Sequence, residues 1–311
     1  MINEIENVVI IGSGSAGLTS AIYAARAGLN PLVLTGIQPG GQLTITTDVE
    51  NYPGFEDVIQ GPWLMEQMQK QAENVGSRIE FDLVKNINIE TNPFHITTDA
   101  GKAINSKSVI IATGAQARWL GIKGEQDFNG KGVSACATCD GFFFREKNVV
   151  VIGGGNTAVE EALYLSNLCK TITVIHRRDE LRAEKILQNR LFKKENINLC
   201  WNSVAKEVLG DENGVNELVV SSTKDDSLSN IKTDGVFVAI GHDPATEIFK
   251  NKIELDKEGY IISKIGSTET SVPGIFAAGD CVDKKYRQAV TAAGMGCMAA
   301  LDAEKWLSSS G

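Results

Sequence analysis

The sequence has no excess of basic residues and no long apolar segment. Its 30 lysines and arginines are outnumbered by 39 aspartates and glutamates, which gives a formal net charge of −9. Nucleic acids and anionic membrane surfaces attract basic patches, so we expect neither as a partner. No apolar run approaches the roughly 18–20 residues that span a bilayer, and residues 1–6 are acidic where a signal peptide would be basic. We therefore expect a cytoplasmic protein.

Cysteines are also sparse, and only one pair is close in sequence. Of the six, Cys136 and Cys139 form a Cys-x-x-Cys, whereas the other four stand singly among apolar neighbours, as small buried side chains do. A structural zinc site usually shows a second close pair of cysteines or histidines, so no metal site is expected. In a reducing compartment a Cys-x-x-Cys is more often catalytic than structural. Such a pair can close a disulfide or act as a reactive dithiol.

Asp140 directly follows the second of these cysteines. Its carboxylate is suitably placed to supply or remove the proton that thiol chemistry requires. The alternative is a solvated turn residue without a chemical role. His95 and His242 are further candidates for proton transfer, but a lone histidine is more often structural, and we assign them no role.

A glycine-rich turn near the N-terminus indicates a dinucleotide site. The apolar run Asn7–Ile11 predicts a buried strand, residues 12–17 read Gly-Ser-Gly-Ser-Ala-Gly, and an alanine-rich helical stretch continues to about Ala27. In G-x-G-x-x-G the first glycine permits a tight turn, the second lets a pyrophosphate approach the backbone, and the third lets helix and strand pack closely. The helix N-terminus then faces the phosphates.

The next predicted strand, Leu32–Thr35, lacks the acidic residue that usually binds a ribose hydroxyl at its end. The chain has Thr35-Gly36 instead, which leaves that contact to Thr35 or to backbone groups. The glycine-rich residues Pro39–Leu43 come shortly afterwards. They could line a flat cofactor, or they could form a plain turn.

A second unit of the same kind follows later in the chain. A predicted strand, Asn148–Ile152, leads into residues 153–158, Gly-Gly-Gly-Asn-Thr-Ala, where alanine replaces the third glycine, an accepted variant. The strand predicted over Thr171–Ile175 ends in His176-Arg177-Arg178, with Arg182 beyond. An acid here would favour NAD, whereas arginines favour the 2′-phosphate of NADP, which guanidinium groups bind in a bidentate manner. The alternative is an exposed basic patch.

The two units are related by an internal repeat. Asn7–Gly12 resembles Asn148–Gly153, and Val109–Gly114 resembles Val236–Gly241. Two nucleotide-binding units are therefore predicted, which fits one site for each of two cofactors.

Elsewhere the pattern is less specific. It predicts a helix over 61–76, short alternating strands over 79–104 and a buried strand over 109–114. The polar, glycine-rich residues 121–132 are a candidate crossing between domains. The C-terminal part holds a strand that ends in Gly279-Asp280 and an apolar helix from Arg287 to about Trp306, which the pattern assigns to neither unit.

Together these motifs resemble the low-molecular-weight, bacterial-type thioredoxin reductases, NADPH-dependent FAD enzymes of the pyridine-nucleotide disulfide oxidoreductase family. The resemblance covers nearly the whole chain and rests on Gly12–Gly17, Gly40–Leu43, Cys136–Asp140, Gly153–Ala158, His176–Arg182, Gly279-Asp280 and Arg287–Ala289. It implies an α/β fold of two Rossmann-like, three-layer ββα dinucleotide-binding domains. The FAD domain would be discontinuous, residues 1–116 and 247–311, and the NADPH domain, residues 117–246, would be inserted into it and carry the Cys-x-x-Cys.

The resemblance also implies two sets of cofactor contacts. Asp280 would hold the ribityl chain of the flavin, and the backbone around Gln288-Ala289 would face the isoalloxazine ring. The FAD set comprises Gly12, Ser13, Gly14, Ala16, Gly17, Thr35, Gly36, Gly40, Gly41, Gln42, Leu43, Asn51, Ala112, Thr113, Gly114, Gly279, Asp280, Arg287, Gln288 and Ala289. The NADPH set comprises Gly153, Gly155, Asn156, Thr157, His176, Arg177, Arg178, Arg182, Ile240 and Gly241.

By the same resemblance, the chain would be a thioredoxin-disulfide reductase that transfers electrons from NADPH through FAD and the Cys136–Cys139 pair to the disulfide of thioredoxin. Cys139 would face the flavin, Cys136 would attack the thioredoxin disulfide, and Asp140 would be the general acid that protonates the outgoing thiolate. Exchange through a mixed disulfide requires an exposed, partly ionised thiol. The two domains would rotate between half-reactions, and the protein would be a homodimer.

Three alternatives stand beside this interpretation. A reductase for a peroxiredoxin typically carries an extra N-terminal thioredoxin-like domain, for which a first strand at Asn7 leaves no room. A flavin reductase that feeds ferredoxin or another non-thiol acceptor would lack the Cys-x-x-Cys. A non-enzymatic nucleotide sensor with the cysteine pair as a redox gauge would not require Arg177, Arg178 and Arg182 beside an intact flavin site.

Overall fold

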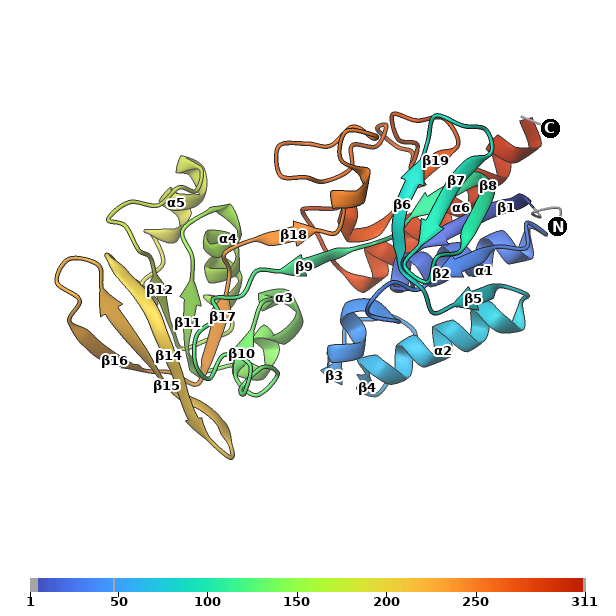
Figure 1. Cartoon of the computed structure of the whole chain (residues 1–311). Coiled ribbons are helices and arrows are strands. Elements are labelled where there is room, and N and C mark those ends of the chain that lie inside the picture. The colour runs from blue at the N-terminus through green and yellow to red at the C-terminus, as the bar shows by residue number, and fades with distance from the viewer. Residues whose placement is uncertain (1–4, 47, 310–311) are drawn as a thin grey trace. The chain divides into compact units, whose positions relative to one another are not determined.

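The computed structural model describes residues 5–46 and 48–309, so four residues of the acidic N-terminal stretch lie outside it. The described residues form two compact units, one up to Gln116 and again from Asp243, the other over Ala117–His242. The chain leaves the first unit through β9 (Ala115–Ala117) and returns through β18 (His242–Pro244). These two strands pair with each other (Figure 1).

The first unit is built on one mixed sheet in the order β5-β2-β1-β8-β7-β6, with β19 also paired to β8. Its parallel strands are β1 (Ile5–Ile11), β2 (Leu32–Leu34), β5 (Arg78–Glu80), β8 (Ala103–Ile111) and β19 (Ile275–Ala277). The antiparallel strands are β6 (Val84–Asn88) and β7 (Phe94–Thr98). The long strand β8 belongs to both the antiparallel and the parallel part of the sheet. Its first half pairs with β7, and its last three residues pair with β19.

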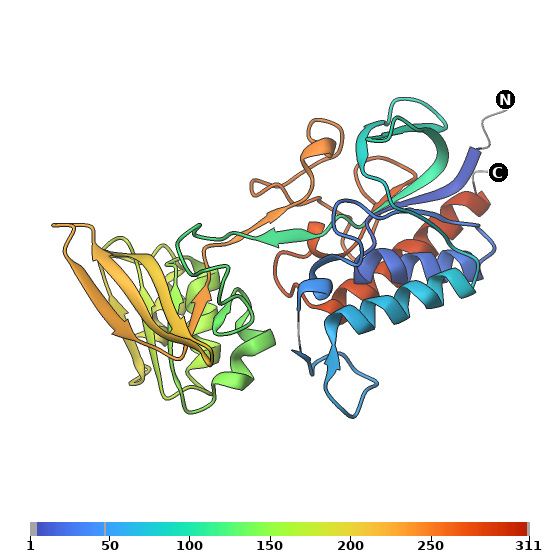
Figure 2. The same ribbon diagram turned by 60° about the horizontal axis from the view of Figure 1, so that its bottom comes forward.

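Three helices cover one face of this sheet: α1 (Ser15–Arg26), α2 (Gly61–Asn74) and α6 (Ala289–Ser309), which lie side by side in Figures 1 and 2. Alternate residues of β1 serve the two faces: Val8 and Ile10 join the core under the helices, and Val9 and Ile11 join the core on the opposite face. A strand buried on both faces reads as a continuous apolar run, which is why this one was evident in the sequence. Each such fully buried aliphatic side chain contributes about 1.5–3 kcal/mol.

Helices α1 and α6 approach each other closely because their contact residues are small. A Cβ at Gly296 would lie 2.2 Å from the carbonyl oxygen of Ala16. The Ser20 hydroxyl is 2.9 Å from the Gly296 carbonyl oxygen, close enough to donate a hydrogen bond to it. The smaller elements of this unit are β3 (Asp48–Val49), β4 (Ile59–Gln60), η1 (Gly41–Ile45), η3 (Glu247–Phe249) and η4 (Gly279–Cys281).

The second unit has three layers. Its central sheet is parallel, in the order β10 (Val133–Ser134), β17 (Gly235–Val238), β11 (Asn148–Ile152), β12 (Thr171–Ile175) and β13 (Ile197–Cys200). The helical segments are α3 (Ala137–Asp140), η2 (Gly141–Phe144), α4 (Asn156–Leu165) and α5 (Lys185–Leu191). An antiparallel sheet of β14 (Ser203–Asp211), β15 (Gly214–Ser222) and β16 (Leu228–Lys232) forms the third layer. Val149 and Val151 pack toward the helices, and Val150 and Ile152 toward the antiparallel sheet.

The fold class predicted from the sequence, two Rossmann-like units of α/β type, is confirmed. The repeated segments occupy equivalent places, because β1 pairs in parallel with β8 in one unit and β11 with β17 in the other. One prediction is wrong: residues 121–132 do not cross between units. They lie within the second unit, where a Cβ at Gly124 would be 2.0 Å from the Val208 carbonyl oxygen. No helix in the described residues is long and apolar enough to cross a membrane.

Candidate active site

The first glycine turn joins β1 to α1. Gly12 has a φ of +107°, and a Cβ there would lie 2.2 Å from the Ala112 carbonyl oxygen. A Cβ at Gly17 would lie 1.9 Å from the Gly12 carbonyl oxygen, so glycine alone allows this approach of helix to strand. A Cβ at Gly14, in contrast, would meet no atom within 4 Å. The turn is therefore closed on the protein side and open beside its second glycine, as a pyrophosphate requires.

Neighbouring loops are tied to this turn by hydrogen bonds. The Ser13 hydroxyl is 3.2 Å from the Thr35 carbonyl oxygen, and it accepts the backbone N–H of Gly40 at 3.0 Å. The Gly36 N–H donates to the Asp82 carbonyl, which holds the end of β2 against the chain after β5. Gly41, with Gln42 and Leu43, opens η1, and a Cβ at Gly41 would lie 3.1 Å from Gly14 Cα. The structure thus brings together the predicted residues of the 12–17, 35–36 and 40–43 segments.

The carboxyl ends of β8 and β19 add the next group of predicted residues. Ala112, Thr113 and Gly114 follow β8, and the Ala278 N–H donates to the Ile111 carbonyl. A Cβ at Gly279 would lie 2.9 Å from the Cβ of Ala16, so this turn lies against the start of α1. Ligands of open parallel sheets bind at this carboxyl edge.

Asp280 is a half-buried acid at this edge, and its Oδ1 is fully buried. Burial, then the nearby Asp283 carboxylate, raises the pKa of Asp280 to about 6, and the Arg287 guanidinium opposes the shift. Its Oδ1 has no hydrogen-bond partner within the described part of the chain. A buried carboxylate oxygen without a donor is costly. A ligand hydroxyl would satisfy it, so the residues present fit the ribityl chain of a flavin.

Asn51 and Gln288, far apart in sequence, meet in this unit. Asn51 Nδ2 lies 3.4 Å from Gln288 Oε1. The Ser15 hydroxyl, on the first glycine turn, is 3.0 Å from the carbonyl oxygen of Ala289. The predicted ring-facing residues at the start of α6 therefore lie beside the glycine turn.

In the second unit, a disulfide joins Cys136 and Cys139, and both cysteines are half-buried. Cys136 precedes α3, and its Sγ accepts the backbone N–H of Cys139 at 3.2 Å. The segment lies on α4, because a Cβ at Gly141 would come within 2.9 Å of Leu165. The second glycine turn leads into α4, so the cysteine segment and that turn both contact the same helix.

Asp140, which directly follows Cys139, is half-buried. Burial raises the pKa of Asp140, and a hydrogen bond from the Ser134 hydroxyl opposes that shift. The same Ser134 oxygen accepts the backbone N–H of Cys136 at 3.0 Å. A raised pKa keeps a carboxyl group protonated at higher pH, which suits a proton donor. The sequence pattern did not single out Ser134, because its contacts depend on how the loop after β10 folds.

The second glycine turn repeats the first with one change. A Cβ at Gly153 would lie 2.4 Å from the Ala239 carbonyl oxygen and 2.7 Å from Ala158 Cβ, whereas one at Gly155 would meet no atom within 4 Å. Asn156 begins α4, and its Oδ1 accepts the Glu184 N–H at 2.9 Å, while Thr157 lies in the first turn of the helix. The predicted residues Ile240 and Gly241 follow β17.

The predicted NADPH residues after β12 separate into two environments. Arg177, Arg178 and Arg182 are exposed, as cations that receive a phosphate must be. His176 is buried at 4 % exposure, and a Cβ at Gly154 would lie 2.3 Å from its ring. Burial, followed by the charge of Arg182, lowers the pKa of His176, so its ring is neutral at pH 7. The neutral histidine ring therefore packs against the backbone of the glycine turn, whereas the three arginines place positive charge at the surface.

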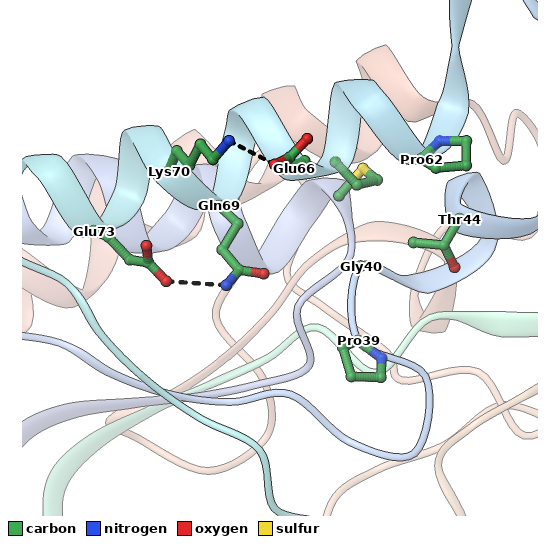
Figure 3. Close-up of a pocket in the computed structure, with 9 residues that line it drawn as sticks. Pro39, Gly40, Thr44, Pro62, Glu66, Gln69, Lys70 and Glu73 are labelled. Atoms are coloured by element: carbon green, nitrogen blue, oxygen red, sulfur yellow. Dashed lines mark hydrogen bonds and ion pairs between the residues drawn. The ribbon is translucent and has the colours of Figure 1, made fainter.

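A pocket of about 330 Å³ lies between α2 and the 39–44 segment (Figure 3). It is lined by Pro39, Gly40, Thr44, Pro62, Met65, Glu66, Gln69, Lys70 and Glu73. The polar side chains that α2 contributes pair with one another: Lys70 with Glu66 at 2.5 Å and Gln69 with Glu73 at 2.9 Å. Among the described residues there is also no group of three or more histidine, cysteine, aspartate or glutamate side chains that could hold a metal ion.

Two dinucleotide turns and a Cys-x-x-Cys define a dinucleotide-dependent disulfide oxidoreductase, and comparison with known proteins agrees. Residues 6–296 match the family model described as pyridine nucleotide-disulphide oxidoreductase. A thioredoxin reductase of Rickettsia conorii is 57% identical over 302 residues, 96% of this chain and 97% of the relative. The solved thioredoxin reductase of Giardia duodenalis is 42% identical with a TM-score of 0.94, covering 97% of this chain and 98% of that one. That of Streptococcus pyogenes is 41% identical with a TM-score of 0.93, covering 99% of each.

The chain therefore belongs to the pyridine nucleotide-disulphide oxidoreductase family, and it is an enzyme. This confirms the resemblance inferred from the motifs. Membership of the family implies the use of a flavin and of NADPH.

Proposed function

We propose that this chain is an NADPH-dependent thioredoxin-disulfide reductase that uses FAD. The observation that carries the proposal is the Cys136–Cys139 disulfide, which lies in the same unit as the second glycine turn, on a segment that packs against α4. Relatives that are more than half identical over nearly the whole chain support thioredoxin as the substrate.

We assign FAD to the first unit and NADPH to the second. The boundaries that the family resemblance implies, 1–116, 117–246 and 247–311, lie within a few residues of the division between the two units. The open space beside Gly14 and the unpartnered Oδ1 of Asp280 support the first assignment. The open space beside Gly155 and the three exposed arginines support the second. When bound, the two cofactors would supply hydride transfer and deliver electrons to the disulfide.

The protein side of the reaction is thiol–disulfide exchange. The Cys136 thiolate attacks one sulfur of the thioredoxin disulfide, forms a mixed disulfide and releases the other sulfur as a thiolate, to which Asp140 donates its proton. Cys139 then attacks Cys136 Sγ, restores the Cys136–Cys139 disulfide and releases the second sulfur of thioredoxin. Thioredoxin gains two electrons, and the cysteine pair loses two.

The dithiol must meet both the flavin and a protein substrate, so we propose that the two units rotate between half-reactions in a homodimer. A cross-link that locks the units should permit one half-reaction and block the other. Undiminished turnover of an efficiently locked enzyme would rule out rotation. Light scattering of the purified protein tests the dimer.

The test of the function is NADPH oxidation with oxidised thioredoxin as acceptor. The wild type should turn over, and Cys136→Ser and Cys139→Ser should each lose at least ~1,000-fold in kcat, because neither can complete the exchange. Cys200→Ser, which removes a cysteine of the same unit outside the pair, is the control and should retain full activity. NADPH oxidation that survives both serine variants would instead indicate a flavin reductase for a non-thiol acceptor.

A further inference from the structure

The segment between η4 and α6 contains an unusual backbone conformation. Arg287 has a φ of +49°, in the left-handed region that side chains other than glycine rarely adopt. Such a conformation is unfavourable for a side chain with a Cβ and persists only where neighbouring groups hold it. The next two residues are Gln288 and Ala289, which the flavin assignment places against the ring.

The group that holds this turn is the carboxylate of Asp283. Its Oδ1 accepts the backbone N–H groups of Lys285 and Tyr286, both at 2.9 Å. Its Oδ2 accepts the N–H of Arg287 at 3.1 Å and lies 3.5 Å from the Thr291 hydroxyl. One side chain therefore binds three consecutive N–H groups and reaches the first turn of α6.

The far side of the turn is tied to the first glycine turn and to the loop at Asn51. Asn51 Nδ2 contacts Gln288 Oε1 at 3.4 Å, and the Ser15 hydroxyl is 3.0 Å from the Ala289 carbonyl. The Thr291 hydroxyl lies 2.9 Å from the Gln288 carbonyl oxygen and 3.3 Å from its backbone nitrogen. Asp283 thus fixes the backbone that leads into Gln288 and Ala289. On their other side, these two residues are held by Asn51 and Ser15.

The Arg287 side chain points back into the protein. Its guanidinium donates to the Lys284 carbonyl at 3.0 Å and hydrogen-bonds the buried phenol of Tyr260. The side chain of Arg287 is therefore held within this unit. The hydrogen bond from its backbone N–H to Asp283 stabilises its left-handed conformation.

We propose that Asp283 is a positioning residue for the flavin, whose carboxylate fixes the 285–287 turn so that Gln288 and Ala289 face the isoalloxazine ring. The inference rests on the proposed function, because it assumes that FAD binds in the first unit. A cap that only stabilised the fold would lower the stability of the apoprotein and leave the affinity for FAD unchanged. The two roles are therefore separable.

The experiment titrates FAD into the apoprotein and follows quenching of FAD fluorescence. Asp283→Ala removes every acceptor and should weaken FAD binding about 30-fold. Asp283→Asn keeps one oxygen and should weaken it about 3-fold. The visible absorption bands of the flavin that remains bound should also shift in Asp283→Ala, because the ring loses its fixed contacts.

The matched control is Asp302→Ala. Asp302 is also a capping carboxylate of the first unit, and it accepts the Thr268 N–H at 2.9 Å and both the Ser267 and Thr268 hydroxyls. Its loss should lower the melting temperature of the apoprotein and leave FAD affinity within 2-fold of wild type. Wild-type affinity in Asp283→Ala, or an equal loss in Asp302→Ala, would overturn the inference. If Asp283→Ala does not fold, wild-type affinity and spectrum in Asp283→Asn would overturn it. A wild type that binds no FAD would refute the proposed function itself.

Discussion

The two glycine turns share one backbone plan but differ in how their helix meets the strand. In the first, a Cβ at the third motif position, Gly17, would lie 1.9 Å from a carbonyl oxygen. In the second, that position is Ala158, and its methyl occupies the space left by the absent Cβ of Gly153. The third residue of the motif therefore reflects how closely the helix packs against the strand. The residues that we propose to distinguish the two ligands follow the next strand in each unit.

The ends of those next strands are where the units diverge chemically. β2 ends in Thr35-Gly36, hydrogen-bonded to the backbone after β5 and without a charged side chain. β12 ends in a buried histidine and three exposed arginines. Both units thus have the same kind of glycine turn. The residues after the next strand are uncharged in the first unit and positively charged in the second.

The largest effect is expected from Gly17→Ala. The added methyl cannot be accommodated beside the Gly12 carbonyl, so α1 must shift, at a cost of about 3 kcal/mol or more in unfolding free energy. The counterpart Ala158→Gly should cost less, about 2 kcal/mol, because it loses a buried methyl group and some helix propensity but creates no clash. Chemical denaturation of the apoprotein measures both. Equal losses would show that the two turns do not differ as described.

A smaller effect is expected from removing the cationic end. Arg177→Ala combined with Arg182→Ala should raise the KM for NADPH about 100-fold, or about 2.7 kcal/mol, because it removes the two charge-assisted contacts proposed for the 2′-phosphate. The KM for NADH should change by less than ~3-fold, since NADH has no 2′-phosphate. Arg190→Ala, which removes another exposed arginine of the same unit, is the control. A parallel rise for both nucleotides would argue against 2′-phosphate recognition.

The smallest effect concerns Asp280, the half-buried acid of the first unit. The pKa of Asp280 is about 6 in the folded chain against 3.8 for an ordinary aspartate, so the folded state binds the proton more tightly than the unfolded state. Stability is therefore lost as pH rises from about 4 to beyond 6. Asp280→Asn should make the apoprotein about 2 kcal/mol more stable than wild type at pH 8 and equally stable near pH 4, while it weakens FAD binding. Melting curves at the two pH values test this, and a variant less stable than wild type at pH 8 would contradict it.

Local patterns in the sequence were sufficient for the parts of the site that depend on backbone shape. Gly12 and Gly153 were evident because a tight turn between strand and helix demands glycine, and Val8 to Ile11 because both faces of β1 are buried. The position of β19 in the first sheet could not be predicted from the sequence, because its pairing with β8 joins residues that are far apart in the chain.

Hydrogen bonds within loops could not be predicted from the sequence either. Ser134 and Asp283 look like ordinary polar residues until the loop conformation aligns them with particular N–H groups. His176 was predicted from its place in an arginine-rich motif, and no pattern indicated that its ring lies beneath Gly154. The cofactor contacts themselves stay predictions.

The most direct test of the central claim is to follow the two sulfurs. The purified enzyme is reduced anaerobically with NADPH, treated with an alkylating reagent and digested, and the cysteine peptides are read by mass spectrometry. We predict that NADPH makes Cys136 and Cys139 alkylatable, and that subsequent addition of oxidised thioredoxin before the alkylating reagent protects both again. A disulfide that stays intact in the presence of NADPH would contradict the account.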